Sequence, residues 1–284
     1  MKAVIPAAGL GSRFLPATKA IPKEMLPVID RPVIQYIVEE ALACGADEVV
    51  IVNSREKTAI PRHFEPSPSL VEELRARGKN SYADAVEQAG ELPVTFVYQD
   101  APLGLGHAVH CAAQETAEDP FLVMLGDVIV PGGSMCTRMR EVSEAHGNAS
   151  VIAVMPVSYD EVSRFGIVGG TDMGSGVLKI TEMVEKPALE DAPSNLAIFG
   201  RYLLSPKVME LLENTKPGAG GEVQLTDALV ALLAEEDVYA LVVDPTEGFD
   251  TGTIATWLSA NIQLAMRDEK MAAQLRPVLE KLLA

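Results

Sequence analysis

Short apolar runs rich in β-branched residues alternate with helical patterns through the first half of the chain, and this alternation restricts the fold more than any other feature. Such runs, bounded by glycine or proline, are typical of buried strands, whereas apolar residues at helical spacing indicate helices. Strands that alternate with helices imply a mostly parallel sheet with helices on both faces. The predicted strands are 3–5, 49–52, 94–98, 121–125 and 151–156, and the predicted helices are 32–44, two within 66–90, 105–115 and 134–146.

The second half of the chain is predicted to add strands and helices to the same sheet. Glycines at Gly169-Gly170 and Gly174–Gly176 indicate turns between its strands. The predicted strands are 164–169, 176–184, 197–203 and 238–243, and the predicted helices are 206–213, 224–235, 253–266 and 269–283. Because no repeat or disordered linker interrupts the pattern, we expect one α/β domain over residues 1–284, a Rossmann-like three-layer mixed sheet with extra strands and C-terminal helices.

The charge of the chain excludes one large class of partners. Among 284 residues, 23 are basic and 40 are acidic, a net charge of −17, whereas proteins that bind nucleic-acid polymers present a basic face. No run of 18 apolar residues is present, so we expect no membrane span. Three scattered cysteines without a C-x-x-C pair indicate reduced thiols and a cytoplasmic location. Residues 1–25 nevertheless hold four basic residues and one acidic residue, so positive charge gathers in one short segment.

That segment continues from the first predicted strand into the glycine-rich sequence Ala7-Ala8-Gly9-Leu10-Gly11-Ser12-Arg13. It is neither a P-loop nor a good dinucleotide fingerprint, because G-x-x-x-x-G-K-[ST] is absent and residue 14 is phenylalanine. Glycines still let backbone N–H groups approach phosphate oxygens, and Arg13 and Lys23 add fixed positive charge. The residues alone leave two interpretations open, a phosphate-binding loop and a surface turn with solvated cations.

Two aspartates stand at positions that suit a metal ion. Asp127 follows the strand 121–125, and ligands of open α/β sheets bind at the carboxyl ends of strands. Asp250 precedes the helix 253–266. Together they suit Mg²⁺, which binds few carboxylates and keeps sites for water and phosphate oxygens. Each aspartate also fits a structural role as the cap of a helix or turn.

A charged pair ends the predicted strand 176–184. Glu185 and Lys186 are adjacent, so their side chains should point to opposite faces unless the backbone bends near Pro187. A carboxylate suits sugar hydroxyls because it accepts several hydrogen bonds. A solvated ion pair is the alternative interpretation.

A glutamine and two histidines follow the third predicted strand. The amide of Gln99 carries a donor and an acceptor and can pair with a pyrimidine edge, although an ordinary loop glutamine fits equally well. His107 and His110 lie three residues apart on a predicted helix. Because no third histidine or cysteine partner is evident, we interpret them as helix positions in the core or near a ligand and not as half of a metal site.

Taken together, these segments resemble the sugar-1-phosphate nucleotidylyltransferases. The resemblance begins with AAGLGSRFLPATKAIPKEMLP, residues 7–27, and continues in order through nearly the whole chain. The other matching segments are PLGLGHAV (102–109), MLGDVIVP (124–131), RFGIV (164–168), MVEKP (183–187), GRYLL (200–204), GEVQLTDAL (221–229) and FDTGT (249–253). The chain is most similar to the branch that makes UDP-glucose, although DTGT is closer to the thymidylyl and adenylyl branches.

The resemblance implies a reaction in which UTP and glucose 1-phosphate give UDP-glucose and pyrophosphate, with Mg²⁺ as cofactor. It assigns Arg13, Lys23 and Lys186 to catalysis; Ala7, Ala8, Gly9, Gly11, Gln99 and Gly104 to the nucleotide; Gly166, Glu185 and Gly200 to the sugar; and Asp127 and Asp250 to the metal. Residues 1–160 would bind mainly the nucleotide, residues 161–252 the sugar, and residues 253–284 another copy of the chain. Members of the family are usually dimers or tetramers, so we expect a homodimer or homotetramer.

Three other functions compete with this one. A glucose-1-phosphate thymidylyltransferase, or another member of the family, differs only in substrate. A non-catalytic sugar-nucleotide sensor is disfavoured because a protein that only binds its ligand need not keep both metal aspartates. A nicotinamide dehydrogenase is disfavoured because the third glycine of its fingerprint is missing.

Overall fold

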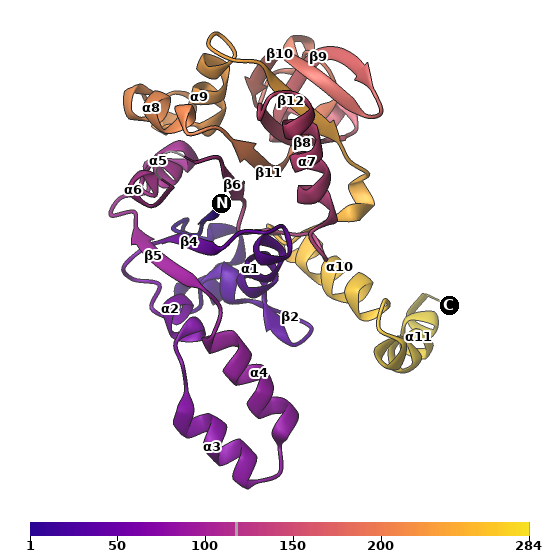
Figure 1. The fold of residues 1–284 in the computed structure, drawn as a ribbon. Coiled ribbons are helices and arrows are strands. Elements are labelled where there is room, and N and C mark those ends of the chain that lie inside the picture. The colour runs from indigo at the N-terminus through magenta and orange to yellow at the C-terminus, as the bar shows by residue number, and fades with distance from the viewer. Residues whose placement is uncertain (117–118, 284) are drawn as a thin grey trace.

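A nine-stranded mixed sheet forms the centre of the molecule (Figure 1). The computed structural model describes residues 1–116 and 119–283; Ala284, the last residue of the segment expected to contact another copy, lies outside them. The strands follow one another across the sheet in the order β5 (Val94–Tyr98), β4 (Glu48–Asn53), β1 (Lys2–Pro6), β6 (Phe121–Met124), β11 (Leu196–Leu204), β8 (Ser150–Pro156), β12 (Val238–Val242), β10 (Val177–Glu185) and β9 (Gly166–Gly174). The predicted single mixed sheet is confirmed.

The two halves of the sheet differ in strand direction. Strands β5, β4, β1 and β6 are all parallel. Strand β11 is antiparallel to both of its main neighbours, β8 and β12 are parallel, and β10 and β9 form an antiparallel hairpin. A tight turn can join only antiparallel strands. The mostly parallel arrangement expected from the first half of the chain and the mixed sheet expected for the whole are therefore both confirmed.

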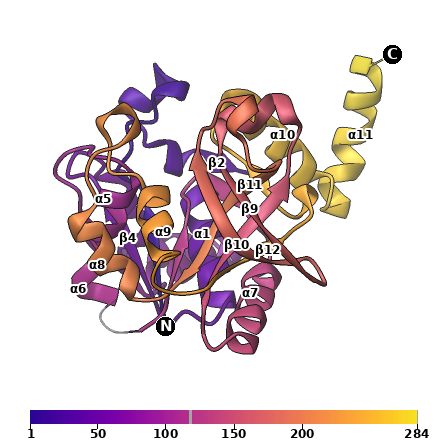
Figure 2. The same ribbon diagram turned by 90° about the horizontal axis from the view of Figure 1, so that it is seen from above.

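Helices cover both faces of the sheet (Figure 2). Helices α1 (Val33–Ala43) and α7 (Ser134–Ala145) pack in one apolar core, and α5 (Leu105–His110), α8 (Lys207–Asn214) and α9 (Leu225–Leu232) pack in the other. Strand β1 explains how one sheet serves two cores, because its residues alternate between the faces. Ala3 and Ile5 belong to the first core and Val4 to the second.

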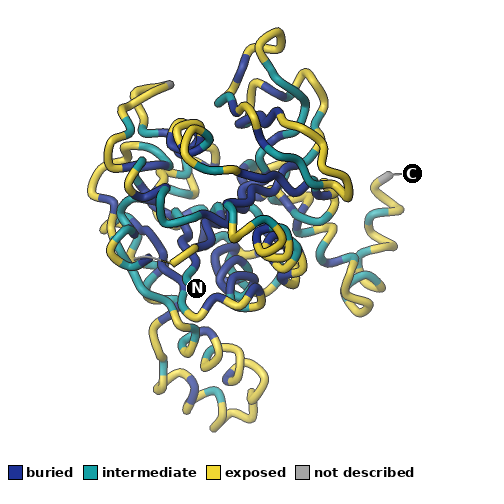
Figure 3. Tube along the Cα trace, turned by 45° about the horizontal axis from the view of Figure 1, so that its top comes forward, coloured by how far each residue is buried: buried dark blue, intermediate teal, exposed yellow. Residues whose placement is uncertain are grey.

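Two helical segments extend away from this body. Helices α3 (Pro68–Ala76) and α4 (Asn80–Gly90) form a projecting arm, and α11 (Glu269–Leu283) follows α10 (Ile254–Ala265) at the other side (Figure 1). Both segments are largely exposed, whereas the central strands β1, β4, β6 and β8 are mostly buried (Figure 3). The predicted helices in 66–90 and in 253–283 are confirmed. None of the helices described is long and apolar enough to cross a membrane.

Two local predictions are wrong. Gly169 and Gly170 do not form a turn but lie inside β9, where a Cβ on Gly170 would come within 2.4 Å of the Lys179 carbonyl oxygen on β10. A close approach of two strands at a bulge, and not a turn, explains the glycine pair. The helix expected over 105–115 divides into α5 and α6 (Ala113–Thr116). The Ala112 N–H bonds to the carbonyl three residues before it, a 3₁₀ pattern that tightens the chain at the break.

Parallel strands place several predicted site residues at one edge of the sheet. The carboxyl ends of β1, β5 and β6 meet there, and the chain continues from them into the glycine-rich segment, Gln99 and Asp127 respectively. Short elements that the sequence did not reveal surround this edge. They are α2 (Ala59–Phe64), β2 (Pro27–Val28) paired with β3 (Arg31–Pro32), and β7 (Val128–Ile129) paired with β13 (Phe249–Asp250).

Candidate active site

The glycine-rich segment folds over the end of β1. The Ala7 N–H donates to the Val52 carbonyl at 2.8 Å, and Thr18 Oγ1 donates to the Gly11 carbonyl at 2.8 Å. The chain beyond the glycines forms a series of three short 3₁₀ turns, 12–14, 17–19 and 23–25. The last of these turns carries Lys23, so the loop brings this cation back beside its own glycines.

Lys23 pairs with the aspartate at the end of β6. Its Nζ lies 2.7 Å from Asp127 Oδ2. Burial opposes a charge on either group, but the Lys23 ammonium and two nearby guanidinium groups outweigh it and hold the pKa of Asp127 below its usual range. The Asp127 carboxylate in turn outweighs the burial of Lys23 and raises the pKa of that lysine. Both groups are therefore charged at neutral pH.

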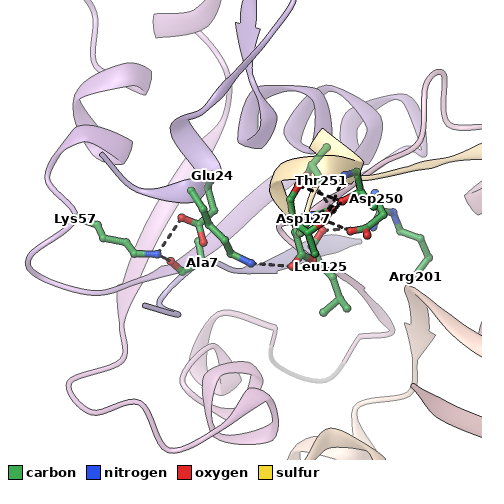
Figure 4. A network of polar contacts seen from close by, with 12 residues as sticks. Ala7, Glu24, Lys57, Leu125, Asp127, Arg201, Asp250 and Thr251 are labelled. Atoms are coloured by element: carbon green, nitrogen blue, oxygen red, sulfur yellow. Dashed lines mark hydrogen bonds and ion pairs between the residues drawn. The ribbon is translucent and has the colours of Figure 1, made fainter. Parts of the chain in front are cut away.

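The short sheet formed by β7 and β13 brings the second aspartate to the same place. Asp250 pairs with Val128 in this sheet, and the Thr251 N–H and Oγ1 donate to the Asp127 carbonyl at 2.7 and 2.9 Å. Asp250 does not cap α10, because Thr253 does so. Instead Asp250 Oδ1 accepts from the Gly252 N–H at 2.7 Å. Two strands of two residues each thus join carboxylates that are far apart in the sequence (Figure 4).

Gly252 marks the point where the charged groups converge. A Cβ at this glycine would lie 2.9 Å from Asp250 Oδ1, 3.2 Å from Asp127 Oδ2 and 3.5 Å from an Arg13 guanidinium nitrogen. The structure therefore gathers four sequence-predicted residues, Arg13, Lys23, Asp127 and Asp250, around one small space. A side chain on residue 252 would intrude on this space.

A buried ion pair that the sequence analysis missed lies beneath this cluster. Arg201 on β11 makes two hydrogen bonds to Glu40 on α1, at 2.9 and 2.7 Å, and both side chains are almost fully buried. Arg201 also donates to the Val128 carbonyl at 2.6 Å, next to Asp127. Gly200, a predicted sugar residue, accepts a hydrogen bond from the Leu125 N–H at 3.0 Å, two residues before the same aspartate. Signals for this pair were a carboxylate on the apolar face of a helix and an arginine inside a buried strand.

Two of the predicted sugar residues, Gly166 and Glu185, meet where β9 begins and β10 ends. Gly166 is in register with Glu185, and Lys186 adopts a left-handed backbone with φ of 47°. The expected bend therefore occurs at Lys186, which lets its Nζ lie 3.3 Å from Glu185 Oε1. Thr226 Oγ1 donates to Glu185 Oε2 at 2.7 Å. The ion pair considered as an alternative does form, and Thr226 is a contact that sequence reasoning missed.

A pocket of about 480 Å³ lies beside the glycine-rich segment. Its lining includes Ala8, Leu10, Lys19, Lys57, Gln99 and Pro102. Lys57, which sequence reasoning did not assign, donates to the Ala7 carbonyl at 2.6 Å and contacts the buried Glu24 carboxylate at 2.9 Å (Figure 4). Burial raises the pKa of Glu24 and lowers the pKa of Lys57, although each partner's charge opposes the change.

Gln99 is 6% exposed at the wall of this pocket. Its Nε2 lies 3.1 Å from the Gly104 carbonyl oxygen and 2.9 Å from His107 Nδ1. The structure thus brings together Gln99 and Gly104, two of the residues predicted to bind the nucleotide. It adds His107, which the sequence analysis had left without a chemical role.

Known proteins resemble this chain along its whole length. The family model described as nucleotidyl transferase matches residues 2–267. The UTP–glucose-1-phosphate uridylyltransferase of Bacillus subtilis (strain 168) is 41% identical over 283 residues, which cover 99% of this chain and 97% of that protein. A solved structure of UTP-bound UGPase from Acinetobacter baumannii aligns with a TM-score of 0.89 and 37% identity over 99% of each chain. One of UDP-glucose pyrophosphorylase complexed with UDP-glucose aligns with a TM-score of 0.84 and 35% identity, covering 94% of this chain and 99% of that one.

Proposed function

We propose a reaction for this chain from the premise that it belongs to the nucleotidyl transferase family. The chain is a UTP–glucose-1-phosphate uridylyltransferase, which converts UTP and glucose 1-phosphate into UDP-glucose and pyrophosphate. The observation that carries this proposal is the 41% identity, over nearly the full length of both proteins, to an enzyme of that name. The similarity to a UTP-bound structure supports the same nucleotide.

Direct in-line displacement fits the residues of the site. A glucose 1-phosphate oxygen attacks the α-phosphorus of UTP, the bond between the α-phosphorus and the bridging oxygen breaks, and pyrophosphate leaves. The nucleophile is already an anion, so the reaction needs no strong general base. The task of the protein is to bring two polyanions together and to offset their charge. Cations gathered around Gly252 support this assignment.

We assign the triphosphate to the glycine-rich segment and its two cations. Backbone N–H groups of Gly9 and Gly11 approach the phosphate oxygens, and Arg13 and Lys23 stabilise the departing pyrophosphate. Lys23 has two roles in this arrangement, because it also keeps Asp127 ionised.

Asp127 and Asp250 fit a magnesium ion. Their carboxylate oxygens are the hard ligands that Mg²⁺ prefers, and the low pKa of Asp127 keeps that carboxylate ionised. Lys23 contacts only one of the two Asp127 oxygens. When bound, Mg²⁺ would neutralise phosphate charge and orient phosphate oxygens.

The sugar and the base occupy opposite sides of this cluster in the proposed complex. Glu185, held by Thr226, accepts hydrogen bonds from sugar hydroxyls, and Lys186 offsets the charge of the attacking phosphate. Gly166 and Gly200 complete the sugar side. The base side consists of Ala7, Ala8, Gln99 and Gly104.

A substrate panel tests the proposal. Pyrophosphate release is measured with UTP, dTTP, CTP and ATP, each combined with several sugar 1-phosphates, with and without EDTA. We expect UTP and glucose 1-phosphate to give the highest kcat/KM, and EDTA to abolish turnover. A preference for dTTP would identify a thymidylyltransferase instead. Tight UDP-glucose binding without metal-dependent turnover would indicate a sensor. The cytoplasmic location and the assembly of two or four copies stay predictions.

A further inference from the structure

The hydrogen-bond partners of the Gln99 amide determine its orientation. The two ends of a glutamine amide look alike in shape, so hydrogen-bond partners must decide which end is nitrogen. Gly104 presents a backbone carbonyl to the amide at 3.1 Å, and a carbonyl oxygen can only accept. The end of Gln99 that faces Gly104 is therefore the NH₂ group.

The same nitrogen determines the state of His107. Gln99 Nε2 lies 2.9 Å from His107 Nδ1, and an amide nitrogen can only donate. His107 Nδ1 must therefore accept, and the tautomer with the proton on Nε2 fits this contact. Cys111 lies near the same ring nitrogen, with Sγ 3.8 Å from Nδ1. Both N–H bonds of the Gln99 amide are thus used within the protein.

Only the acceptor end of Gln99 remains for a ligand. Among the described residues, no hydrogen bond to Gln99 Oε1 is found, although the side chain is almost fully buried and lines the pocket beside Ala8. The backbone on either side of Gly104 is itself held in place. Val223 accepts from the Gly106 N–H and donates to the Leu103 carbonyl, each at 2.8 Å, on either side of Gly104. The acceptor is therefore preorganised before any nucleotide binds.

We propose that His107 is a positioning residue that keeps Gln99 Oε1 turned toward the base, so that the pocket selects nucleobases with an imide N3–H and rejects cytosine. Uracil and thymine carry a proton on N3, whereas cytosine N3 is an acceptor that would face another acceptor. This proposal rests on the proposed function, because it assumes that the base of the nucleotide substrate lies at Gln99. It also corrects the expectation that Gln99 offers both a donor and an acceptor to the base.

Without His107, only the hydrogen bond to the Gly104 carbonyl holds the amide, so turning it over breaks one hydrogen bond instead of two and becomes easier. A turned amide presents N–H groups, which suit cytosine N3. Losing the buried hydrogen bond and the fixed orientation should raise KM for UTP about 5- to 10-fold and lower the UTP/CTP ratio of kcat/KM about 10-fold. The dTTP/UTP ratio should stay unchanged, because thymine and uracil share the same N3–H. The kcat at saturating UTP should change less than about 2-fold, since His107 does not touch the phosphates.

Three substitutions separate positioning from simple packing. His107→Ala removes the acceptor. His107→Asn places Oδ1 where Nδ1 stands and keeps an acceptor for the Gln99 NH₂ group. His107→Gln places its polar atoms farther out, near the position of Nε2. We expect His107→Asn to keep the KM and the UTP/CTP ratio of the wild type, and both other variants to lose them.

The kinetic comparison uses the full-length enzyme with UTP, dTTP and CTP at saturating glucose 1-phosphate. Rescue by His107→Asn but not by His107→Gln supports the proposal, and these two variants remain informative if His107→Ala does not fold. Equal behaviour of the Asn and Gln variants, or an unchanged UTP/CTP ratio in both His107→Ala and His107→Gln, would overturn it. A wild-type enzyme that makes no UDP-glucose would instead refute the proposed function, so the two failures are distinguishable.

Discussion

Two ion pairs with the same N–O distance flank the end of β6, and they have different roles. Lys23–Asp127 and Arg201–Glu40 each have an N–O distance of 2.7 Å. The side chains of the first pair are 20% and 26% exposed, whereas those of the second are 0% and 1% exposed. Exposure, and not distance, decides which pair can meet a ligand.

The buried pair helps to hold the partly exposed pair in position. Arg201 donates to the Val128 carbonyl and Asp127 is the residue before it, so the position of the aspartate depends on the buried arginine. A charge inside a protein must be paired, because an unpaired one carries the full cost of desolvation. A partly exposed pair costs less to break and can exchange partners with a substrate. We therefore expect the buried pair to control stability and the exposed pair to control turnover.

The largest effect should come from breaking the buried pair. Arg201→Met leaves the Glu40 carboxylate buried without its charged partner and should lower the free energy of unfolding by about 3–5 kcal/mol. Urea unfolding measures the change. The double variant Glu40→Leu/Arg201→Met is the matched control, and it should lose much less because no buried charge remains. Equal losses in both variants would mean that packing, and not the unpaired charge, is responsible.

The next effect concerns turnover and not stability. Asp127→Ala removes a carboxylate from the centre of the charged cluster and should lower kcat at least about 10²-fold, or about 2.7 kcal/mol in the barrier. Steady-state pyrophosphate release measures it. Asp84→Ala is the control, since Asp84 pairs with Arg75 on the projecting arm and should keep full activity. Near wild-type turnover in a folded Asp127→Ala enzyme would refute the assignment of this site.

A third ion pair, Lys57–Glu24, combines features of the buried and the partly exposed pair. Lys57 contacts the buried Glu24 and donates to the Ala7 carbonyl, so it is part of the core and of the loop at once. Lys57→Met should cost about 2 kcal/mol of stability, because a Glu24 whose pKa burial already raises can take up a proton and limit the loss. It should also raise KM for UTP. A stability loss without a change in KM would place Lys57 with Arg201, as a purely structural cation.

The sequence predicted the local elements of this arrangement better than the contacts between segments far apart in the chain. Apolar periodicity and glycine position are local signals, so the strands, the glycine-rich segment and Asp127 at a strand end followed from them. The contact of Arg201 with Glu40 joins elements far apart in the chain. Neither segment contains a sequence pattern that indicates which residue the other one pairs with. The role of His107 depends on which atom faces it, and no spacing rule contains that information.

Local signals also fail where an element is too short to have a period. Strands β7 and β13 have two residues each, yet their pairing is what brings Asp127 and Asp250 together. Family resemblance, and not periodicity, placed both aspartates in one site. Gly169 and Gly170 show the opposite error, since a local turn signal was present but two strands in close contact required the glycines.

The smallest effect should appear in the pH dependence of stability. Lys23 holds the pKa of Asp127 below its usual value of 3.8, so the folded chain favours the ionised carboxylate. A group of this kind stabilises the fold at pH values above its unfolded pKa, and the contribution is lost as the pH falls through the lower folded pKa. Asp127→Asn lacks it, and for a partly exposed pair we expect a loss of about 1 kcal/mol or less at neutral pH.

The measurement is urea unfolding of the wild type and of Asp127→Asn between about pH 7 and pH 3. The difference in unfolding free energy between the two should shrink as the pH falls from the ordinary aspartate pKa toward the lower folded pKa, because the unfolded wild-type chain then takes up a proton that the folded chain does not. The raised pKa of Lys23 keeps the ammonium charged throughout this range, so its own titration does not contribute. If the difference in unfolding free energy stays constant down to the lowest pH, then packing, and not the charge of Asp127, accounts for the effect of the substitution. Charge would then not explain why the Lys23–Asp127 pair differs from the buried Arg201–Glu40 pair.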